Sequence, residues 1–173
     1  VIPRLLDEVL HLLPLLHGRH GVNYMRTIRG KTPVIYDNQE AFEIGGSKLH
    51  GSNSEIAGAV VAAGITVHAA LEAQERLRNE GIKIAVVDAY SLKPVDSEQI
   101  RRVAETGHFL LAVEDHYPEG GLGEAVAAAA EGKAPVYIQG VTKKPHSGAS
   151  AQLLAEQGLD AEGIVERVRE VAG

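Results

Sequence analysis

Residues 108–130 read HFLLAVEDHYPEGGLGEAVAAAA, and the class of fold can be predicted from this stretch. The apolar run 109–113 is typical of a buried strand. The polar cluster 114–119 follows it, and a glycine-rich turn then leads into an alanine-rich helix. In a parallel α/β sheet the carboxyl end of a strand presents side chains to ligands or neighbouring domains. We therefore expect the acids, histidine and tyrosine of this cluster to face something outside the core.

Two further strand-and-helix units precede this stretch. The pattern predicts a buried strand at 56–63 followed by a helix at 66–78. It also predicts a strand at 82–88 and a helix that begins at Asp96, where Gln99 stands at the spacing of a capping box. Strands that alternate with helices favour a mostly parallel sheet with helices on both faces.

The remaining segments complete the predicted sheet. Residues 33–54 are extended and turn-rich, which indicates a linker plus one edge strand, and residues 136–141 supply a further strand. Two short terminal helices follow, the last beginning at Asp160 with four apolar residues expected on its buried face: Ile164, Val165, Val168 and Val171. The predicted fold class is α/β: three αβα layers around a mostly parallel sheet of about five strands, with one antiparallel edge strand.

The first part of the chain follows a different pattern. Residues 5–16 are rich in leucine, too apolar for a solvated leader, and Pro14 is expected to interrupt any helix that they form. Residues 21–27 alternate in the manner of a strand, and the basic loop 28–33 follows. These segments need a partner surface, so a domain boundary is expected near this loop.

Composition narrows the classes of function. The chain has 173 residues, 45% of them hydrophobic, with a net charge of -6 and no cysteine. One buried domain with an appendage fits this length. With this charge, no cluster of Lys and Arg is expected to outweigh the acids on one face, which argues against nucleic acid as a partner. No apolar run approaches the ~20 residues that span a bilayer. Without cysteine there are no disulfides or thiolate metal sites, which fits a reducing cytosol.

The start of the sequence is not typical of a complete protein or of a signal peptide. The chain opens on Val1 rather than methionine, and Asp7 and Glu8 interrupt the apolar core that a signal peptide would need. We expect a piece whose true start lies elsewhere.

The glycine turn is partly similar to the glycine-rich loop that binds dinucleotides. Gly121 and Gly123 match the first two glycines of that fingerprint, but Val126 stands where the third is required. Glu119 and Glu124 would also repel a pyrophosphate from the helix N-terminus. A cofactor site here is disfavoured, and we interpret the glycines as a tight strand-to-helix turn.

The polar cluster has two interpretations. His116 beside Glu114 and Asp115 could form a general acid and base set. However, consecutive residues at a strand end point to opposite sides, so neighbouring members cannot converge on one substrate. We therefore favour an interface or supporting cluster over catalysis for five residues: Glu114, Asp115, His116, Tyr117 and Glu119. The histidine spacing predicts no metal site.

Three cations stand close together near the predicted boundary. Arg26, Arg29 and Lys31 lie at the end of the expected strand and in the loop after it, where guanidinium groups suit phosphate or carboxylate ligands. A solvated basic loop is the alternative. No nucleophile elbow, P-loop or zinc hydrolase motif is present, so no catalytic residue is predicted and the chain alone offers no complete active site.

Several motifs, in this order, resemble the C-terminal part of transketolases. They are GVNYMRTIR at 21–29, PVIYDN at 33–38, AAGITVHAAL at 62–71, DAYSLKPVD at 88–96, VEDHYPEGGLGEA at 113–125 and KKPHSG at 143–148. Related thiamine enzymes share this domain, but His116, Tyr117 and Pro118 favour transketolase. The resemblance covers nearly the whole chain.

The resemblance implies an activity that this chain would share with other domains. Transketolases are cytoplasmic, dimeric transferases of the pentose phosphate pathway, and they move a two-carbon ketol unit between sugar phosphates with thiamine diphosphate and Mg2+ or another divalent metal. The family's metal and diphosphate motif and its activating glutamate have no counterpart here. We therefore expect no bound cofactor or metal on this chain alone, and inactivity without a companion or the remaining domains.

The resemblance also implies how the chain is divided into domains and which residue binds substrate. Residues 1–35 would be the end of the preceding pyrimidine-binding domain and the linker, and residues 36–173 the C-terminal domain. Arg29 matches the family's arginine that binds the phosphate of the substrate. The alternative is a noncatalytic α/β interaction module of a thiamine-dependent 2-oxoacid dehydrogenase or deoxyxylulose-phosphate synthase, which would bind a partner through its strand-end acids.

Overall fold

A computed structural model describes residues 12–27, 32–37, 39–52 and 54–173. It contains one five-stranded sheet with the strand order β1-β3-β2-β4-β5. The strands are β1 (Lys48–His50), β2 (Gly58–Ala62), β3 (Ile84–Asp88), β4 (Leu110–Val113) and β5 (Val136–Gln139). The named helices are α2 (Ile65–Asn79), α3 (Ser97–Thr106), α4 (Leu122–Ala130), α5 (Ser150–Glu156) and α6 (Ala161–Ala172).

The sheet is parallel except at one edge. Strand β2 lies at its centre and pairs in parallel with β3 and β4, so that Val60 stands beside Val86 and Leu111. Strand β1 pairs antiparallel with β3, and β5 is parallel to β4. The predicted α/β class, with a mostly parallel five-stranded sheet and one antiparallel edge strand, is confirmed.

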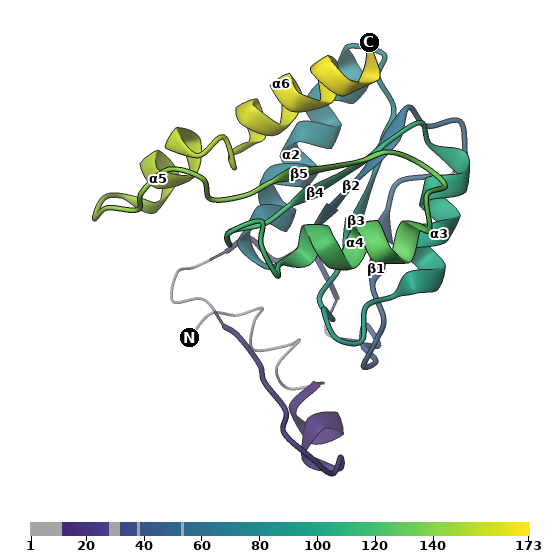
Figure 1. The fold of residues 1–173 in the computed structure, drawn as a ribbon, viewed down its shortest axis with the longest axis vertical. Helices are drawn as coiled ribbons and strands as arrows, with labels where there is room; N and C mark the ends of the chain where they lie inside the picture. Colours follow the sequence, from purple (N-terminus) through teal and green to yellow (C-terminus); the bar gives the residue numbers. More distant parts are fainter. Residues whose placement is uncertain (1–11, 28–31, 38, 53) are drawn as a thin grey trace.

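Helices cover both faces of the sheet (Figure 1). Because successive side chains of a strand point to opposite faces, each strand contributes to two cores. Val61 and Val87 belong to the core under α3 and α4. Val60 and Val86 belong to the core under α2 and α6. All five residues of β2 and β3 are buried, which explains their continuous apolar sequences.

Local signals set the helix boundaries. The carboxylate of Asp96 accepts a hydrogen bond from the backbone N–H of Gln99 at 3.0 Å, so the predicted cap of α3 is confirmed. Asp160 caps α6 in the same way through the N–H of Gly163, also at 3.0 Å. Ile164, Val165 and Val168 are buried as predicted. Val171 is only half-buried because it lies in the last turn of the helix.

Two expectations for the first part of the chain are wrong. Residues 12–17 are helical on both sides of Pro14, so the proline does not interrupt the helix there. Residues 22–27 are extended but form no strand, because no neighbouring segment within the described ranges pairs with them. The predicted loop residues 28–31 lie outside the described residues.

In the described part of the chain, no helix is both long enough and apolar enough to cross a bilayer.

Candidate functional site

The carboxyl end of β4 places three consecutive polar side chains in three different environments. Glu114 is buried, Asp115 is half-buried and His116 is exposed. The backbone here is fixed by β5 and by the chain that follows it: the N–H of Glu114 donates to Gln139 at 3.0 Å, and the carbonyl of His116 accepts from Val141 at 2.8 Å. The backbone of residues 114–116 is therefore held in place on both sides of Asp115.

The carboxylate of Glu114 lies at the N-terminus of α4. It accepts hydrogen bonds from the backbone N–H of Leu122 at 2.7 Å and of Gly123 at 3.0 Å. These donors have no partner inside the helix, and the positive end of the helix dipole favours an anion there. A Cβ atom on Gly121 would lie 1.9 Å from the Oε2 atom of Glu114. Gly121 is therefore required to make room for this carboxylate.

This arrangement explains the glycines that resemble a nucleotide-binding loop. Glu114 already fills the position at the helix N-terminus that a phosphate would take in such a loop. Gly123 allows close packing between α4 and β5, because its Cβ atom would meet three side-chain atoms of Ile138 at 2.6 Å. The loop contains an internal anion and is not shaped to accept a diphosphate.

His116 does not form a converging acid and base set with its neighbours. Its Nδ1 atom lies 2.7 Å from the carbonyl oxygen of Tyr117 and 3.9 Å from the carboxylate of Glu114. That carboxylate points into the start of α4. Tyr117 is 51% exposed. Glu119 is exposed and makes no hydrogen bond or ion pair with another residue of the described part. An interface role for these residues stays a prediction.

Asp115 connects the strand end to the first part of the chain. Its carboxylate forms an ion pair with the guanidinium of Arg26, which lies in the extended segment 22–27. Two residues that are 89 positions apart are brought together in this way. Arg29 and Lys31, the other two predicted cations, lie outside the described residues.

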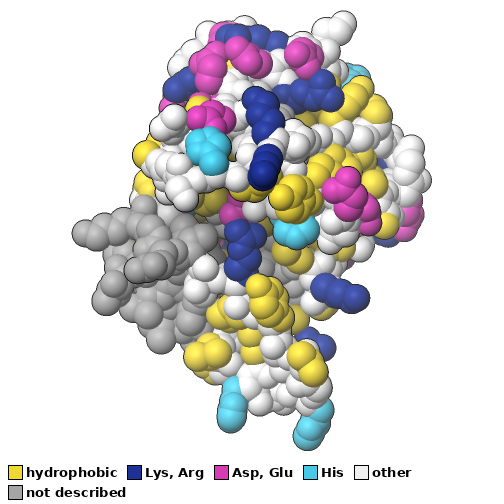
Figure 2. Space-filling model, turned by 60° about the vertical axis from the view of Figure 1, so that its left-hand side comes forward, with side chains coloured by type: hydrophobic (Ala, Val, Ile, Leu, Met, Phe, Trp, Pro, Cys, Tyr) yellow, Lys and Arg dark blue, Asp and Glu magenta, His cyan; other side chains and the backbone are white. Residues whose placement is uncertain are grey.

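The N-terminal segment exposes apolar side chains. In the described residues from 12 to 27, four large hydrophobic residues are exposed: Leu13, Leu15, Val22 and Tyr24. Figure 2 shows hydrophobic side chains at the surface of this lower part of the molecule, which Figure 1 identifies as the purple helix and the segment after it. Large apolar side chains gathered at a surface favour contact with another surface.

A second polar cluster lies at the end of β3, and sequence reasoning missed it. Asp88 is 3% exposed and accepts a hydrogen bond of 2.5 Å from the hydroxyl of Tyr36. The same hydroxyl lies 2.9 Å from Nε2 of His50 in β1. Burial raises the pKa of Asp88 to about 6, although Tyr36 and Lys48 act to lower it. The only signal in the sequence is an acid as the last residue of a buried strand.

His50 has a perturbed pKa as well. Burial lowers it, while the carboxylate of Glu40 opposes that shift and the charge of Lys48 adds to it. Lys48 forms an ion pair with Glu40, so the two charges that flank the cluster are themselves paired. The cluster joins the linker, β1 and β3 at one edge of the sheet.

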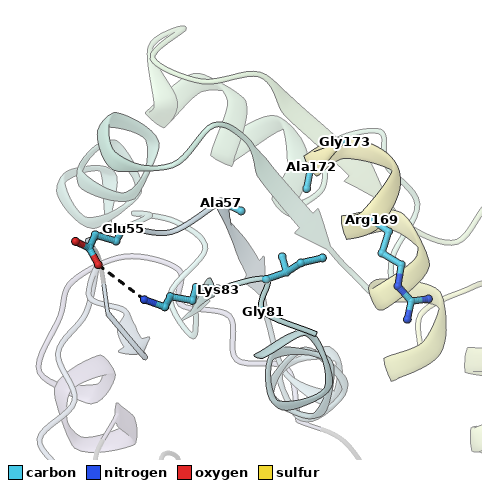
Figure 3. A pocket seen from close by; sticks show the side chains of 8 residues that line it. Glu55, Ala57, Gly81, Lys83, Arg169, Ala172 and Gly173 are labelled. Carbon is cyan, nitrogen blue, oxygen red and sulfur yellow. Dashed lines mark ion pairs between the residues drawn. The ribbon is translucent and has the colours of Figure 1, made fainter. Parts of the chain in front are cut away.

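A hollow lies at the opposite end of the sheet. It encloses about 520 Å³, and Figure 3 shows Glu55, Ala57 and Lys83 on one side of it and Arg169 on the other. Lys83 lies 3.8 Å from Glu55. Arg169 is held by two hydrogen bonds to Glu80, at 2.6 and 3.0 Å. Each cation of this hollow therefore lies beside a carboxylate.

A groove of about 480 Å³ lies between the linker and the helices α2, α5 and α6. Its walls are mostly apolar and include Pro33, Ile35, Ile65 and Leu154. Neither hollow contains a strand-end acid. In the described ranges no group of three or more histidine, aspartate or glutamate side chains is arranged to hold a metal ion.

Comparison with known proteins is consistent across sequence and structure. The family model described as "Transketolase, C-terminal domain" matches residues 52–164. The chain is 39% identical to mouse (Mus musculus) transketolase-like protein 2 over 163 residues, which is 92% of this chain and 26% of that protein. It is 39% identical to human (Homo sapiens) transketolase over 152 residues, which is 86% of this chain and 24% of that protein. The chain thus spans about a quarter of these relatives.

Two solved structures resemble the fold. A split-gene transketolase described as an inactive beta4 tetramer has a TM-score of 0.75 and 33% identity, over 83% of this chain and 48% of that one. The 2-oxoglutarate:ferredoxin oxidoreductase of Magnetococcus marinus has a TM-score of 0.57 and 21% identity, over 74% of this chain and 20% of that one. The similarity to the oxidoreductase shows only that the two proteins share a fold.

Proposed function

Because the chain belongs to the transketolase family through its C-terminal domain, we propose that it works as the C-terminal part of a transketolase, either as a segment or as a separate subunit. The complete enzyme would transfer a two-carbon ketol unit between sugar phosphates. The observation that carries this proposal is the match to a split-gene transketolase chain, which extends over 83% of this chain at 33% identity.

The cofactors of the family do not fit the described residues. The N-terminus of α4 is filled by the carboxylate of Glu114, and no metal-binding cluster exists in the described ranges. We therefore assign no step through thiamine diphosphate or a divalent metal to this chain. Both would be held by the remaining domains, and this chain would be inactive alone.

The direct contribution of this chain to the active site would be phosphate binding by Arg29. The residue follows Arg26 by three positions in the motif that resembles the family's phosphate-binding segment. Arginine suits this role because its planar guanidinium donates two parallel hydrogen bonds to phosphate oxygens.

The rest of the chain would serve assembly. We place the domain boundary near residue 35, with residues 1–35 forming the end of the pyrimidine-binding domain and the linker. The exposed Val22 and Tyr24 support this placement, because apolar side chains at a surface favour a protein partner. A homodimer in the cytoplasm is proposed, and the absence of cysteine fits a reducing compartment.

The interaction-module alternative has less support. The 2-oxoglutarate:ferredoxin oxidoreductase is 21% identical to this chain, whereas mouse transketolase is 40% identical to it. The transketolase assignment is therefore preferred to a module of a 2-oxoacid dehydrogenase or a deoxyxylulose-phosphate synthase.

A chimera tests the proposal directly. This chain would replace the matching C-terminal part of human transketolase, and ketol transfer between sugar phosphates would be measured beside the same enzyme truncated before that part. We expect the chimera to restore transfer that the truncated enzyme lacks. A chimera that folds and dimerises but transfers no ketol unit would contradict the proposal.

Calorimetry of the isolated chain tests the cofactor assignment. Titration with thiamine diphosphate and Mg2+ is expected to release no binding heat. A stoichiometric site on the isolated chain would show that its residues hold the cofactor after all.

A further inference from the structure

The linker before β1 (residues 32–37 and 39–47) contains no strand, so no backbone ladder joins it to the sheet. Hydrogen bonds to side chains hold it there: the backbone N–H of Glu43 donates to the hydroxyl of Tyr90 at 3.3 Å, and that of Gly45 donates to Oγ of Ser91 at 2.9 Å. Segments with few backbone bonds to a core open locally at a lower free energy than the core unfolds. We therefore expect the linker to detach from the sheet edge more readily than the strands separate.

Tyr36 is the linker residue that reaches the buried end of β3. Its hydroxyl donates to the carboxylate of Asp88 at 2.5 Å and lies 2.9 Å from Nε2 of His50. Its ring packs edge-on against Phe42, with ring centroids 5.4 Å apart, and Phe42 is itself buried. The linker thus covers Asp88, which is 3% exposed. Detachment of the linker would admit water to this carboxyl group.

The charges around Asp88 also depend on the docked linker. Lys48 of β1 stands opposite Asp88 in the antiparallel register, but it forms an ion pair with Glu40 of the linker. When the linker detaches, Lys48 loses Glu40 and can turn to Asp88. Burial lowers the pKa of His50 on the same strand. Burial raises the pKa of the Tyr90 hydroxyl, which follows β3, so this group keeps its proton at neutral pH.

We propose that Tyr36, Asp88 and His50 form a pH-sensitive switch for docking of the linker: protonated Asp88 keeps the linker on the sheet edge, and ionised Asp88 favours its release. A carboxylate without water is costly, and release gives Asp88 both water and the charge of Lys48. Protonation of His50 at low pH acts in the opposite direction. Because the linker connects the N-terminal segment to the sheet, the switch controls how firmly the two are joined.

Amide hydrogen exchange of the full chain between about pH 5 and about pH 8 tests the switch, with every rate corrected for the intrinsic effect of pH. Protection of residues 39–47 reports opening of the linker, and protection of β4 reports unfolding of the sheet. Docking raises the pKa of Asp88 from 3.8 to about 6, so its stabilising effect is lost as pH rises through about 6. Linker protection in the wild type, divided by that in Asp88→Asn, should fall by up to about tenfold over this range. His50 is present in both proteins, so its effect largely cancels.

Ser91→Ala is the matched control. It removes another bond that holds the linker, the one from the N–H of Gly45, and neither group of that bond titrates. Linker protection should fall by the same factor at every pH. Tyr36→Phe provides a second test, which also applies if Asp88→Asn does not fold. It removes the hydroxyl that donates to ionised Asp88, so linker protection should fall by about tenfold at about pH 8 and by less at about pH 5.

Three results would overturn the switch. If the ratio of linker protection between the wild type and Asp88→Asn is the same at every pH, Asp88 does not control docking. If the linker is as well protected as β4 in the wild type, it opens only when the whole sheet unfolds. If the effect of Ser91→Ala depends on pH as that of Asp88→Asn does, any weakening of the linker produces the signal and Asp88 has no special role.

Discussion

Asp88 is the last residue of β3, and every residue of this strand is buried. Its carboxyl group is therefore removed from water. Removal from water disfavours the ionised form, and this raises its pKa from 3.8 to about 6. The hydroxyl of Tyr36 is shared between Asp88 and His50. When Asp88 is ionised the hydroxyl donates to it, whereas a protonated Asp88 can donate to Tyr36 and free the hydroxyl to donate to His50.

The raised pKa predicts how stability depends on pH. A group whose pKa is higher in the folded than in the unfolded state stabilises the fold fully below its unfolded pKa, here 3.8, and this stability is lost as pH rises through about 6. Asn cannot ionise, so Asp88→Asn should remove this dependence. The free energy of unfolding of the wild type, minus that of the variant, should fall by about 2.5 kcal/mol between pH 4 and pH 7.

Urea unfolding at a series of pH values provides this difference. The lowered pKa of His50 acts in the opposite direction, since protonation of a buried histidine destabilises the fold as pH falls. His50 is present in both proteins, so its contribution largely cancels from the difference. A difference that stays constant with pH would mean that Asp88 has an ordinary pKa.

At the scale of an element, α4 depends on a side chain outside it. Glu114 satisfies two N–H groups of the first turn from eight and nine positions earlier in the chain. A capping residue directly before the helix cannot do this here, because Gly121 has no side chain. The first turn of α4 is thus tied to the end of β4.

Glu114→Gln should destabilise the protein by about 2 kcal/mol at neutral pH, because charged hydrogen bonds are lost and an amide N–H2 faces backbone donors. Glu124→Gln is the matched control: Glu124 lies in the same turn but is exposed, so the expected loss is about 0.5 kcal/mol. Chemical denaturation measures both. Equal losses would indicate that the helix dipole alone, and not the buried contact, explains the role of Glu114.

The packing of α4 on β5 gives a second prediction at this scale. Gly123→Ala should destabilise the protein by about 1–3 kcal/mol, because the new methyl group overlaps the branched side chain of Ile138. In an Ile138→Ala background the same change should become neutral or stabilising, since space opens and alanine favours helix. Thermal unfolding of the four proteins measures the coupling. Additive effects would show that the two residues do not meet.

The elements that sequence predicted well are those with an unambiguous pattern. The apolar runs at β2, β3 and β4 are short and bounded by turn residues, which favours buried strands, and Asp96 and Asp160 mark helix starts through a local hydrogen bond. Residues 21–27 show what a local sequence pattern cannot predict. Alternation indicates two faces, but a strand also needs a neighbouring backbone, and that partner is not specified locally.

Only part of the candidate site could be predicted from the sequence. The strand-end position of residues 114–116 followed from the pattern, because parallel strands present their carboxyl ends together. The contacts of Tyr36 with Asp88, 52 positions away, did not. Many polar residues could meet a buried acid, and the choice among them depends on how the linker crosses the sheet.

At the scale of the whole molecule, the two cores are built from residue 56 onward, with Ile35 and Leu49 packed at their margins. The N-terminal residues contribute no buried residue to either core within the described part. The sheet with its covering helices should therefore be able to fold without them.

Removal of residues 1–32 tests this expectation. The shortened chain should unfold in one cooperative transition, with a free energy of unfolding within about 1 kcal/mol of the full chain, the value of one exposed ion pair. Calorimetric melting of both chains, with circular dichroism of the folded states, measures the change. Loss of the cooperative transition would place residues 1–32 within the folding unit.

Glu114 also has a consequence for redesign. It acts as a covalently attached ligand in a cradle of two backbone N–H groups, facing a glycine that leaves the space open. Shortening it by Glu114→Ala would turn the cradle into an artificial receptor of the size of a small carboxylate. Formate or acetate added to that variant would then be expected to recover part of the lost stability by chemical rescue.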